Sequence, residues 1–317
     1  MASEKPLALL MTAPVGRIRE ALGVHCRIEL WREVTDRDAF LANEGPSVRI
    51  LVTAGGVPIR DTLLDHLPNL GLIAFFSSGY EGVNLSEARR RGIELSHAPN
   101  TNHEDVADIA IGLTIATVRR LSEADAIIRS GDWTRPLPIR MTPSLRQLRY
   151  GIVGLGAVGQ AIAERLEAFG GKIAWWGPRP KPQVRWPRAR TLLDLARESD
   201  VLILALRADE TNRGIIDAAV LEAIGPHGYL VNVARGLVVD EDALVDALRS
   251  GRLAGAGLDV YAKEPTDPER WRDLPSVALA PHVGGWAEGS FRETERLLGE
   301  NVRLHLAGEP LLTPVPE

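Results

Sequence analysis

The sequence has a single cysteine, Cys26, among its 317 residues. One cysteine cannot build an internal disulfide framework, and it cannot supply a cysteine-rich metal site. The seven histidines show no spacing typical of metal ligands, so we expect no metal. A low cysteine content suits a reducing compartment, which favours a cytoplasmic location.

A net positive charge and long apolar runs are also lacking. The net charge is −5, so bulk electrostatics give no reason to expect nucleic acid or a membrane surface as a partner. No uninterrupted apolar stretch reaches membrane-spanning length. The segment 1–6 shows no basic region followed by a long apolar run, and we expect no signal peptide. A chain of this length can form two domains, each with its own core.

What the sequence does have is a glycine-rich stretch at residues 150–163, YGIVGLGAVGQAIA. A short apolar run ends there in a GxGxxG pattern, and an amphipathic helix follows, as in a dinucleotide-binding βα turn. The first glycine permits a tight turn, the second lets the backbone approach a pyrophosphate, and the third lets helix and strand pack closely. We expect the phosphates at the helix N-terminus. The expected binding residues are Gly154, Leu155, Gly156, Ala157, Val158 and Gly159. The alternative is a glycine-rich turn without a ligand.

The stretch after the second strand of this unit lacks an acid. NAD-specific folds usually place Asp or Glu about 20 residues into the motif, where it binds the ribose hydroxyls. Here the strand ends in WWGPRPK, and Arg179 and Lys181 offer cations suited to a 2′-phosphate. The sequence therefore favours NADP(H) over NAD(H), although a solvated basic loop is the alternative.

The first third of the chain alternates apolar runs with amphipathic segments. Runs at 7–11, 48–52 and 72–76 are separated by segments such as 60–67 and 85–91, which predicts a parallel sheet with helices on both faces. Ligands bind such sheets beyond the carboxyl ends of the strands. Ser78 and Gly79 follow one strand end, where backbone N–H groups could hold a small carboxylate. Ordinary turn residues are an equal alternative.

Residues 97–102 break this pattern and predict a crossing between domains. A long helix is expected from about His103 to Ser130, followed by an extended arm at 131–138 that carries Trp133. An arm that belongs to neither sheet suggests a subunit contact and a homodimer, unless Trp133 is a local core residue.

Further strands are expected at 201–205, 229–233, 256–258 and 277–280, with a helix at 240–250. They complete a second doubly wound sheet, and a last helix at 290–306 is expected to return to the first domain. We therefore predict an α/β protein in which a Rossmann dinucleotide-binding domain, 99–287, is inserted into a flavodoxin-like substrate-binding domain, 1–98 and 288–317.

Three stretches in the second domain place a polar residue after a strand: VNVARGLVVDE at 231–241, AGAGLDVYAKEP at 254–265 and APHVGGW at 280–286. With these motifs in order, the chain resembles the D-isomer-specific 2-hydroxyacid dehydrogenases, most of all their glyoxylate/hydroxypyruvate and hydroxyphenylpyruvate reductase branch. The similarity runs from SGYEGV at 78–83 to HVG at 282–284.

The resemblance implies reduction of a small 2-oxo acid by a nicotinamide cofactor. It implies that His282 is the general acid, Glu264 its carboxylate partner, and Arg235 the group that binds the substrate carboxylate. Singly, each is more simply a structural or loop residue; together, in family order, they indicate a catalytic site. The resemblance also implies cofactor contacts at Val233, Ala234, Asp259 and Gly284, and substrate contacts at Ser78 and Gly79.

Two other functions compete with this interpretation. A formate- or phosphite-type dehydrogenase of the same superfamily would carry further substrate-specific polar residues and an NAD-type acid. A dinucleotide-sensing corepressor would keep the fold and work by binding protein partners through an exposed groove or long tails.

Overall fold

A computed structural model describes residues 5–11, 15–274 and 276–316 of the chain. The start of the N-terminal segment in which no signal peptide is expected, residues 1–4, lies outside the described residues. The chain divides into two compact units, residues 1–102 with 287–317, and residues 103–286. Each is described by itself.

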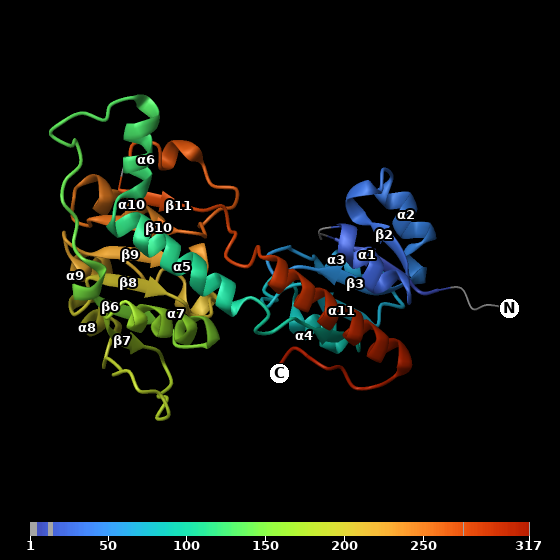
Figure 1. Cartoon of the computed structure of the whole chain (residues 1–317). Helices are drawn as coiled ribbons and strands as arrows, with labels where there is room; N and C mark the ends of the chain where they lie inside the picture. The colour runs from blue at the N-terminus through green and yellow to red at the C-terminus, as the bar shows by residue number, and fades with distance from the viewer. Residues whose placement is uncertain (1–4, 12–14, 275, 317) are drawn as a thin grey trace. The chain divides into compact units, whose positions relative to one another are not determined.

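The first unit is built on a parallel sheet of five strands in the order β2-β1-β3-β4-β5. Figure 1 labels two of them, β2 and β3. This is the flavodoxin-like order of a doubly wound fold. Strands β1 and β4 are buried along their whole length, which explains why they are continuous apolar runs. The strands are β1 (Leu7–Leu10), β2 (Arg27–Leu30), β3 (Val48–Thr53), β4 (Leu72–Phe75) and β5 (Glu94–Ser96). The helices are α1 (Val15–Gly23), α2 (Arg37–Asn43), α3 (Asp61–Leu64), α4 (Leu85–Arg90) and α11 (Glu288–Ala307).

The second unit has a parallel sheet of six strands in the order β11-β10-β9-β8-β6-β7. Its strands are β6 (Arg149–Val153), β7 (Lys172–Trp176), β8 (Val201–Leu204), β9 (Tyr229–Asn232), β10 (Gly255–Leu258) and β11 (Val277–Leu279). Its helices are α5 (His103–Val118), α6 (Leu121–Ser130), α7 (Ala157–Ala168), α8 (Leu192–Arg197), α9 (Ala218–Ile224) and α10 (Glu241–Arg249). Short 3₁₀ turns connect elements in both units: Trp31–Glu33, Gly45–Ser47, Leu145–Gln147, Glu210–Asn212, Gly236–Val238 and Pro268–Arg270.

Two apolar cores lie on the two faces of the second sheet. Helices α5 and α7 contribute to one core, and α8, α9 and α10 contribute to the other (Figure 1). The chain passes from β7 at one edge back across β6 to β8, so the strand order reverses between β6 and β8. Ligands of doubly wound sheets bind at this switch point. The predicted class, two doubly wound α/β units, is confirmed.

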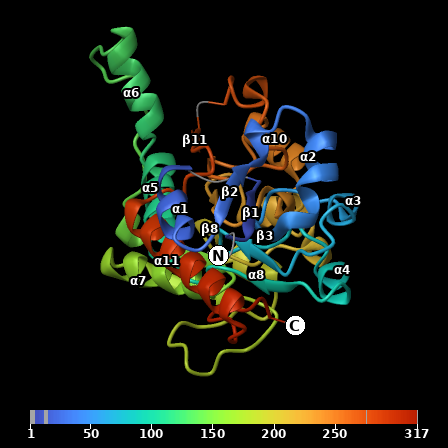
Figure 2. The same cartoon turned by 90° about the vertical axis from the view of Figure 1, so that its right-hand side faces the viewer.

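The single helix expected at residues 103–130 is wrong. The structure has two helices, because Arg120 adopts a left-handed conformation with φ of 54° between α5 and α6. The last turn of α5 has already tightened, since the Arg120 N–H donates to the carbonyl of Thr117. Figure 2 shows α6 and the loop after it extending away from the sheet of their unit. Trp133 in that loop is 65% exposed, so it is not a core residue within this chain.

Candidate active site

The glycine-rich turn has the geometry that a pyrophosphate requires. Gly154 has φ of +90°, and a Cβ there would lie 2.5 Å from the Cα of Leu206. A Cβ on Gly159 would lie 2.1 Å from the carbonyl oxygen of Gly154, so helix and strand are in close contact. Gly156 instead faces open space, and as N-cap of α7 it leaves the first N–H groups without a side-chain acceptor. These donors and the positive end of the helix dipole fit a phosphate group.

The other predicted residues of the turn differ in how they could contact a ligand. Leu155 is buried in the core and offers only its backbone, whereas Ala157 and Val158 are half-buried at the start of α7. The carbonyl oxygen of Leu155 accepts a hydrogen bond of 2.6 Å from Nζ of Lys181. The structure therefore brings one of the two predicted cations directly onto the glycine-rich turn.

The loop after β7 begins at the buried Gly177, and the exposed Arg179 follows it. Sequence reasoning missed Arg188, whose Nη2 donates to the carbonyl oxygen of Gly177 at 2.7 Å. Arg188 also forms a parallel bridge with Trp175, beside β7. Arg188 lies eleven residues beyond Gly177 in the chain, and this bridge helps to bring it back to the strand end.

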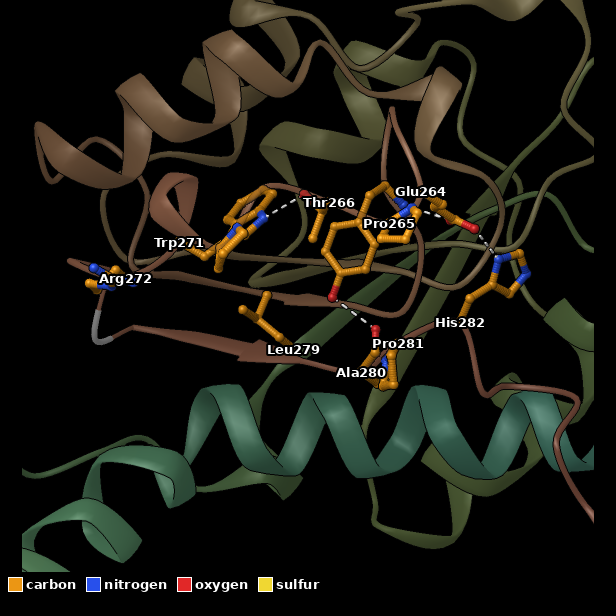
Figure 3. Close-up of a pocket in the computed structure, with 11 residues that line it drawn as sticks. Glu264, Pro265, Thr266, Trp271, Arg272, Leu279, Ala280, Pro281 and His282 are labelled. Atoms are coloured by element: carbon orange, nitrogen blue, oxygen red, sulfur yellow. Dashed lines mark hydrogen bonds and ion pairs between the residues drawn. The ribbon is translucent and has the colours of Figure 1, made fainter.

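His282 and Glu264 form the central contact of the site (Figure 3). Glu264 follows β10 and His282 follows β11, and these strands are parallel neighbours whose carboxyl ends meet. The imidazole Nδ1 lies 2.6 Å from Oε2 of Glu264. An ionised carboxylate only accepts hydrogen bonds, so Nδ1 carries a hydrogen and donates it, which leaves Nε2 for another partner.

The charge on Glu264 is favoured by its surroundings. Partial burial raises the pKa of this carboxyl, but the hydrogen bonds from His282 and the Tyr261 N–H lower it, as do the charges of His282 and Arg235. The net result is a pKa below the usual 4.5. Glu264 is therefore ionised at neutral pH.

Asp259 holds the backbone of the histidine loop. Its side chain is 2% exposed, and its two oxygens accept the N–H groups of Val283 and Gly284, each at 2.8 Å. The N–H of His282 donates to the Asp259 carbonyl, also at 2.8 Å. These bonds stabilise His282 at φ of 55°, a left-handed conformation that non-glycine residues seldom adopt.

Arg235 follows β9, at the same edge of the sheet. It is half-buried, and its Nη1 donates to the carbonyl oxygen of Ala234 at 2.8 Å. Val233 and Ala234 before it are buried. Sequence reasoning missed Asn232, a 1% exposed residue whose side chain accepts from the Ala234 N–H and donates to the Arg235 carbonyl, both at 3.0 Å. Asn232 thereby fixes the turn that carries Arg235.

A cavity of 840 Å³ lies beside the His282–Glu264 pair (Figure 3). Its walls are mostly apolar and come from the loop after β10, the last residue of β11 and the residues that follow β11. The lining residues are Tyr261, Glu264, Pro265, Thr266, Pro268, Trp271, Arg272, Leu279, Ala280, Pro281 and His282.

Ser78 and Gly79 belong to the other unit, where they form a braced loop after β4. Ser77 Oγ accepts the Gly55 N–H at 2.8 Å and donates to the Gly79 carbonyl at 2.7 Å. Ser78 Oγ donates to the Ala98 carbonyl at 2.8 Å. The loop is thus fixed by side chains and presents its backbone.

Among the described residues, no group of three or more His, Cys, Asp and Glu side chains could hold a metal ion. Within residues 5–11, 15–274 and 276–316, no helix is both long and apolar enough to cross a bilayer.

Comparison with known proteins places this geometry in a family. Residues 111–284 match the model of the D-isomer specific 2-hydroxyacid dehydrogenase NAD binding domain. The chain is 38% identical to hydroxyphenylpyruvate reductase of Plectranthus scutellarioides over 285 residues, which cover 90% of each protein. It is also 38% identical to a glyoxylate/hydroxypyruvate reductase of Arabidopsis thaliana over 280 residues, covering 88% of this chain and 89% of that one.

Solved structures agree. An NADPH-dependent glyoxylate/hydroxypyruvate reductase from Sinorhizobium meliloti, in complex with NADP and malonate, has a TM-score of 0.90 at 36% identity and covers 98% of this chain and 97% of its own. The chain belongs to the D-isomer specific 2-hydroxyacid dehydrogenase family. It is an oxidoreductase that acts on the CH–OH group of 2-hydroxy acids and binds a nicotinamide dinucleotide.

Proposed function

We propose that this protein is an NADPH-preferring 2-oxo acid reductase that converts glyoxylate, hydroxypyruvate or a related 2-oxo acid to the D-2-hydroxy acid. The observation that carries the proposal is the 2.6 Å contact between His282 Nδ1 and Glu264 Oε2 at the carboxyl edge of the sheet. It orients one imidazole and leaves Nε2 as a proton donor. The relatives named as glyoxylate/hydroxypyruvate and hydroxyphenylpyruvate reductases support the substrate class.

When bound, the reduced nicotinamide supplies the hydride for the carbonyl carbon. In this proposal, His282 donates the Nε2 proton to the carbonyl oxygen, so that hydride and proton together give the alcohol. The carboxylate of Glu264 stabilises the charged imidazole before that transfer. Arg235 binds the substrate carboxylate and polarises its carbonyl group.

The two units have separate tasks in this proposal. Residues 99–287 bind the dinucleotide through the turn at Gly154–Gly159, with Asp259 and Gly284 near the nicotinamide. Residues 1–98 and 288–317 bind the substrate, and the backbone of Ser78 and Gly79 holds its carboxylate.

The preference for NADPH is supported by the loop after β7. Arg179 and Lys181 provide positive charge at a strand end without an acidic residue, and a 2′-phosphate would be attracted where a carboxylate would repel it. The Sinorhizobium meliloti structure neighbour is NADPH-dependent.

We also propose that the protein is a homodimer. Helix α6 and the loop after it carry an unusual share of exposed apolar side chains, among them Ile128 at 62%, Trp133 at 65%, Leu137 at 57% and Met141 at 100%. A second copy of the chain would cover this surface.

The cytoplasmic location expected from the low cysteine content stays a prediction.

The proposal is tested by mixing the purified protein with NADPH and glyoxylate, hydroxypyruvate or phenylpyruvate and following the loss of NADPH absorbance. We expect consumption that depends on the 2-oxo acid, with a higher kcat/KM for NADPH than for NADH. Tight NADPH binding without consumption in any of these mixtures would instead support a dinucleotide-sensing binding protein.

A further inference from the structure

Glu241, the first residue of α10, directs its side chain away from its own helix. The side chain is 12% exposed, and both of its oxygens have partners in the segment 262–270. Oε1 accepts the Ala262 N–H at 2.8 Å, and Oε2 lies 3.0 Å from Nε of Arg270. An acid in a first helical turn can serve the helix dipole from solvent. The partial burial and the two partners of Glu241 indicate another task.

The Ala262 N–H lies next to the N–H that holds Glu264. Tyr261 donates its N–H to Oε1 of Glu264 at 3.0 Å, while Oε2 of the same carboxylate contacts His282 at 2.6 Å. Two consecutive N–H groups of one loop therefore bind two acids, Glu241 on the helix and Glu264 in the site.

This loop also lies against backbone. A Cβ on Gly236 would lie 1.8 Å from the carbonyl carbon of Tyr261, so the turn after Arg235 is in direct contact with the loop. The loop thus has two contacts, one with that turn and one with the carboxylate of Glu241. Without Glu241, Ala262 would lose the acceptor of its N–H, and only the contact with the turn would remain of the two.

We propose that Glu241 is a positioning residue that acts through the Tyr261–Ala262 loop to hold Glu264 against His282. The inference rests on the proposed function, in which His282 and Glu264 carry out proton transfer. None of the hydrogen bonds described above joins Glu241 to Glu264 or to His282. Small displacements of a catalytic group lower turnover strongly. None of the hydrogen bonds described for the cofactor turn at Gly154–Gly159 involves this loop.

The test compares two conservative variants that separate the length of the Glu241 side chain from its charge. Glu241→Asp keeps the charge and the helix-terminal acid but is one methylene short, so we expect kcat to fall about 10- to 100-fold. Glu241→Gln loses the charge but keeps an oxygen for the Ala262 N–H, so we expect kcat within about fivefold of the parent. The KM for NADPH should stay unchanged in both.

Asp246→Asn is the matched control, because Asp246 lies on the same helix and pairs with Arg252 rather than with the loop. It should leave kcat unchanged, and thermal unfolding of each variant confirms that the helix is intact. Full kcat in Glu241→Asp, or equal losses in Glu241→Asp and Asp246→Asn, would overturn the positioning role.

A second readout does not depend on turnover. The Nδ1–H proton of His282, observed by NMR and assigned by its loss in His282→Gln, should broaden or shift in Glu241→Asp and persist in Asp246→Asn. If the parent protein reduces no 2-oxo acid, the proposed function fails while this signal still reports on the loop. If the parent is active and the signal is the same in Glu241→Asp, the positioning role alone fails.

Discussion

The two units each contain a histidine–glutamate pair of nearly the same geometry. In one, Nδ1 of His282 lies 2.6 Å from Glu264; in the other, Nδ1 of His305 lies 2.5 Å from Glu94. The histidine side chains differ in exposure, 45% for His282 and 14% for His305. The other edge of the His305 ring also lies against the backbone of Gly71, where a Cβ would be 2.8 Å from Nε2.

The difference follows from where each pair lies on its sheet. His282 and Glu264 come after the carboxyl ends of neighbouring strands, beside a cavity. Glu94 begins a strand, and His305 lies in the last turn of α11. A histidine at a helix C-terminus favourably meets the negative end of the dipole, and a paired carboxylate adds to that. Under the proposed function, the same pair geometry serves catalysis at the carboxyl edge of one sheet, and we expect it to serve local stability in the other unit.

The most severe test of this comparison is His282→Ala. We expect kcat to fall about 10²- to 10⁴-fold because the proton donor is lost. Binding of NADPH, measured by fluorescence titration, should survive. A variant that keeps normal turnover would remove the functional distinction between the two pairs.

Glu264→Gln tests the carboxylate of the pair and should lower kcat about 10- to 100-fold, because a neutral amide no longer stabilises the charged imidazole.

The contribution of Glu264 to the free energy of unfolding should depend on pH in a defined direction. The folded pKa of Glu264 is lowered below 4.5, so the carboxylate stabilises the fold above that pH and loses its contribution as pH falls through the lower folded value. Urea unfolding at a series of pH values should show the difference between the parent and Glu264→Gln shrinking below about pH 4.5.

Arg235→Ala extends the comparison to the neighbouring strand end. A charged hydrogen bond to the substrate carboxylate is worth about 1.5–3 kcal/mol, so kcat/KM for the 2-oxo acid should fall about 10- to 100-fold. Steady-state kinetics with varied 2-oxo acid measures this loss. An unchanged kcat/KM would place the substrate carboxylate elsewhere.

A smaller effect is expected at two arginines that follow β7, Arg179 and Arg188. They carry the same side chain but lie in different surroundings. Arg179→Ala should shift the NADPH-to-NADH ratio of kcat/KM toward NADH by about tenfold, since an exposed guanidinium can pair with a phosphate. Arg188 is occupied by the Gly177 carbonyl, so Arg188→Lys should leave the ratio closer to that of the parent. The reverse order of effects would assign phosphate recognition to Arg188.

The smallest effect is expected for His305→Gln. It should leave kcat unchanged and lower the free energy of unfolding by about 1 kcal/mol, the range of a single hydrogen-bonded or surface pair. Denaturant unfolding and the NADPH assay together measure both quantities. A loss of turnover without a loss of stability would contradict the assignment of this pair to structure.

Local patterns made much of the fold predictable from sequence. The glycine-rich turn was predictable because strand, turn and helix are contiguous, and the structure gives Gly154 its positive φ. The parallel sheets were predictable because buried strands such as β8 are continuous apolar runs. Proximity of His282 to Glu264 came from the family resemblance, not from spacing alone.

The parts that could not be predicted depend on contacts between distant or unremarkable residues. Asn232 and Glu241 are ordinary polar residues in the sequence. The structure shows that they accept hydrogen bonds from the backbone N–H groups of Ala234 and Ala262, respectively. Arg188 returns to β7 through a bridge between segments that are separate in the sequence. The break at Arg120 has no sequence signal, because arginine seldom adopts the left-handed conformation and neither glycine nor proline marks the position.

The bridge beside β7 has a consequence for engineering. Trp175 donates its N–H to the carbonyl of Pro187 and accepts from the N–H of Ala189, and its indole N–H donates to the carbonyl of Trp186. Both ends of the segment between Gly177 and Trp186 are therefore anchored to one strand. Under the proposed function, replacing the residues between these two ends is expected to change the choice of cofactor, while β7 keeps its pairing with β6.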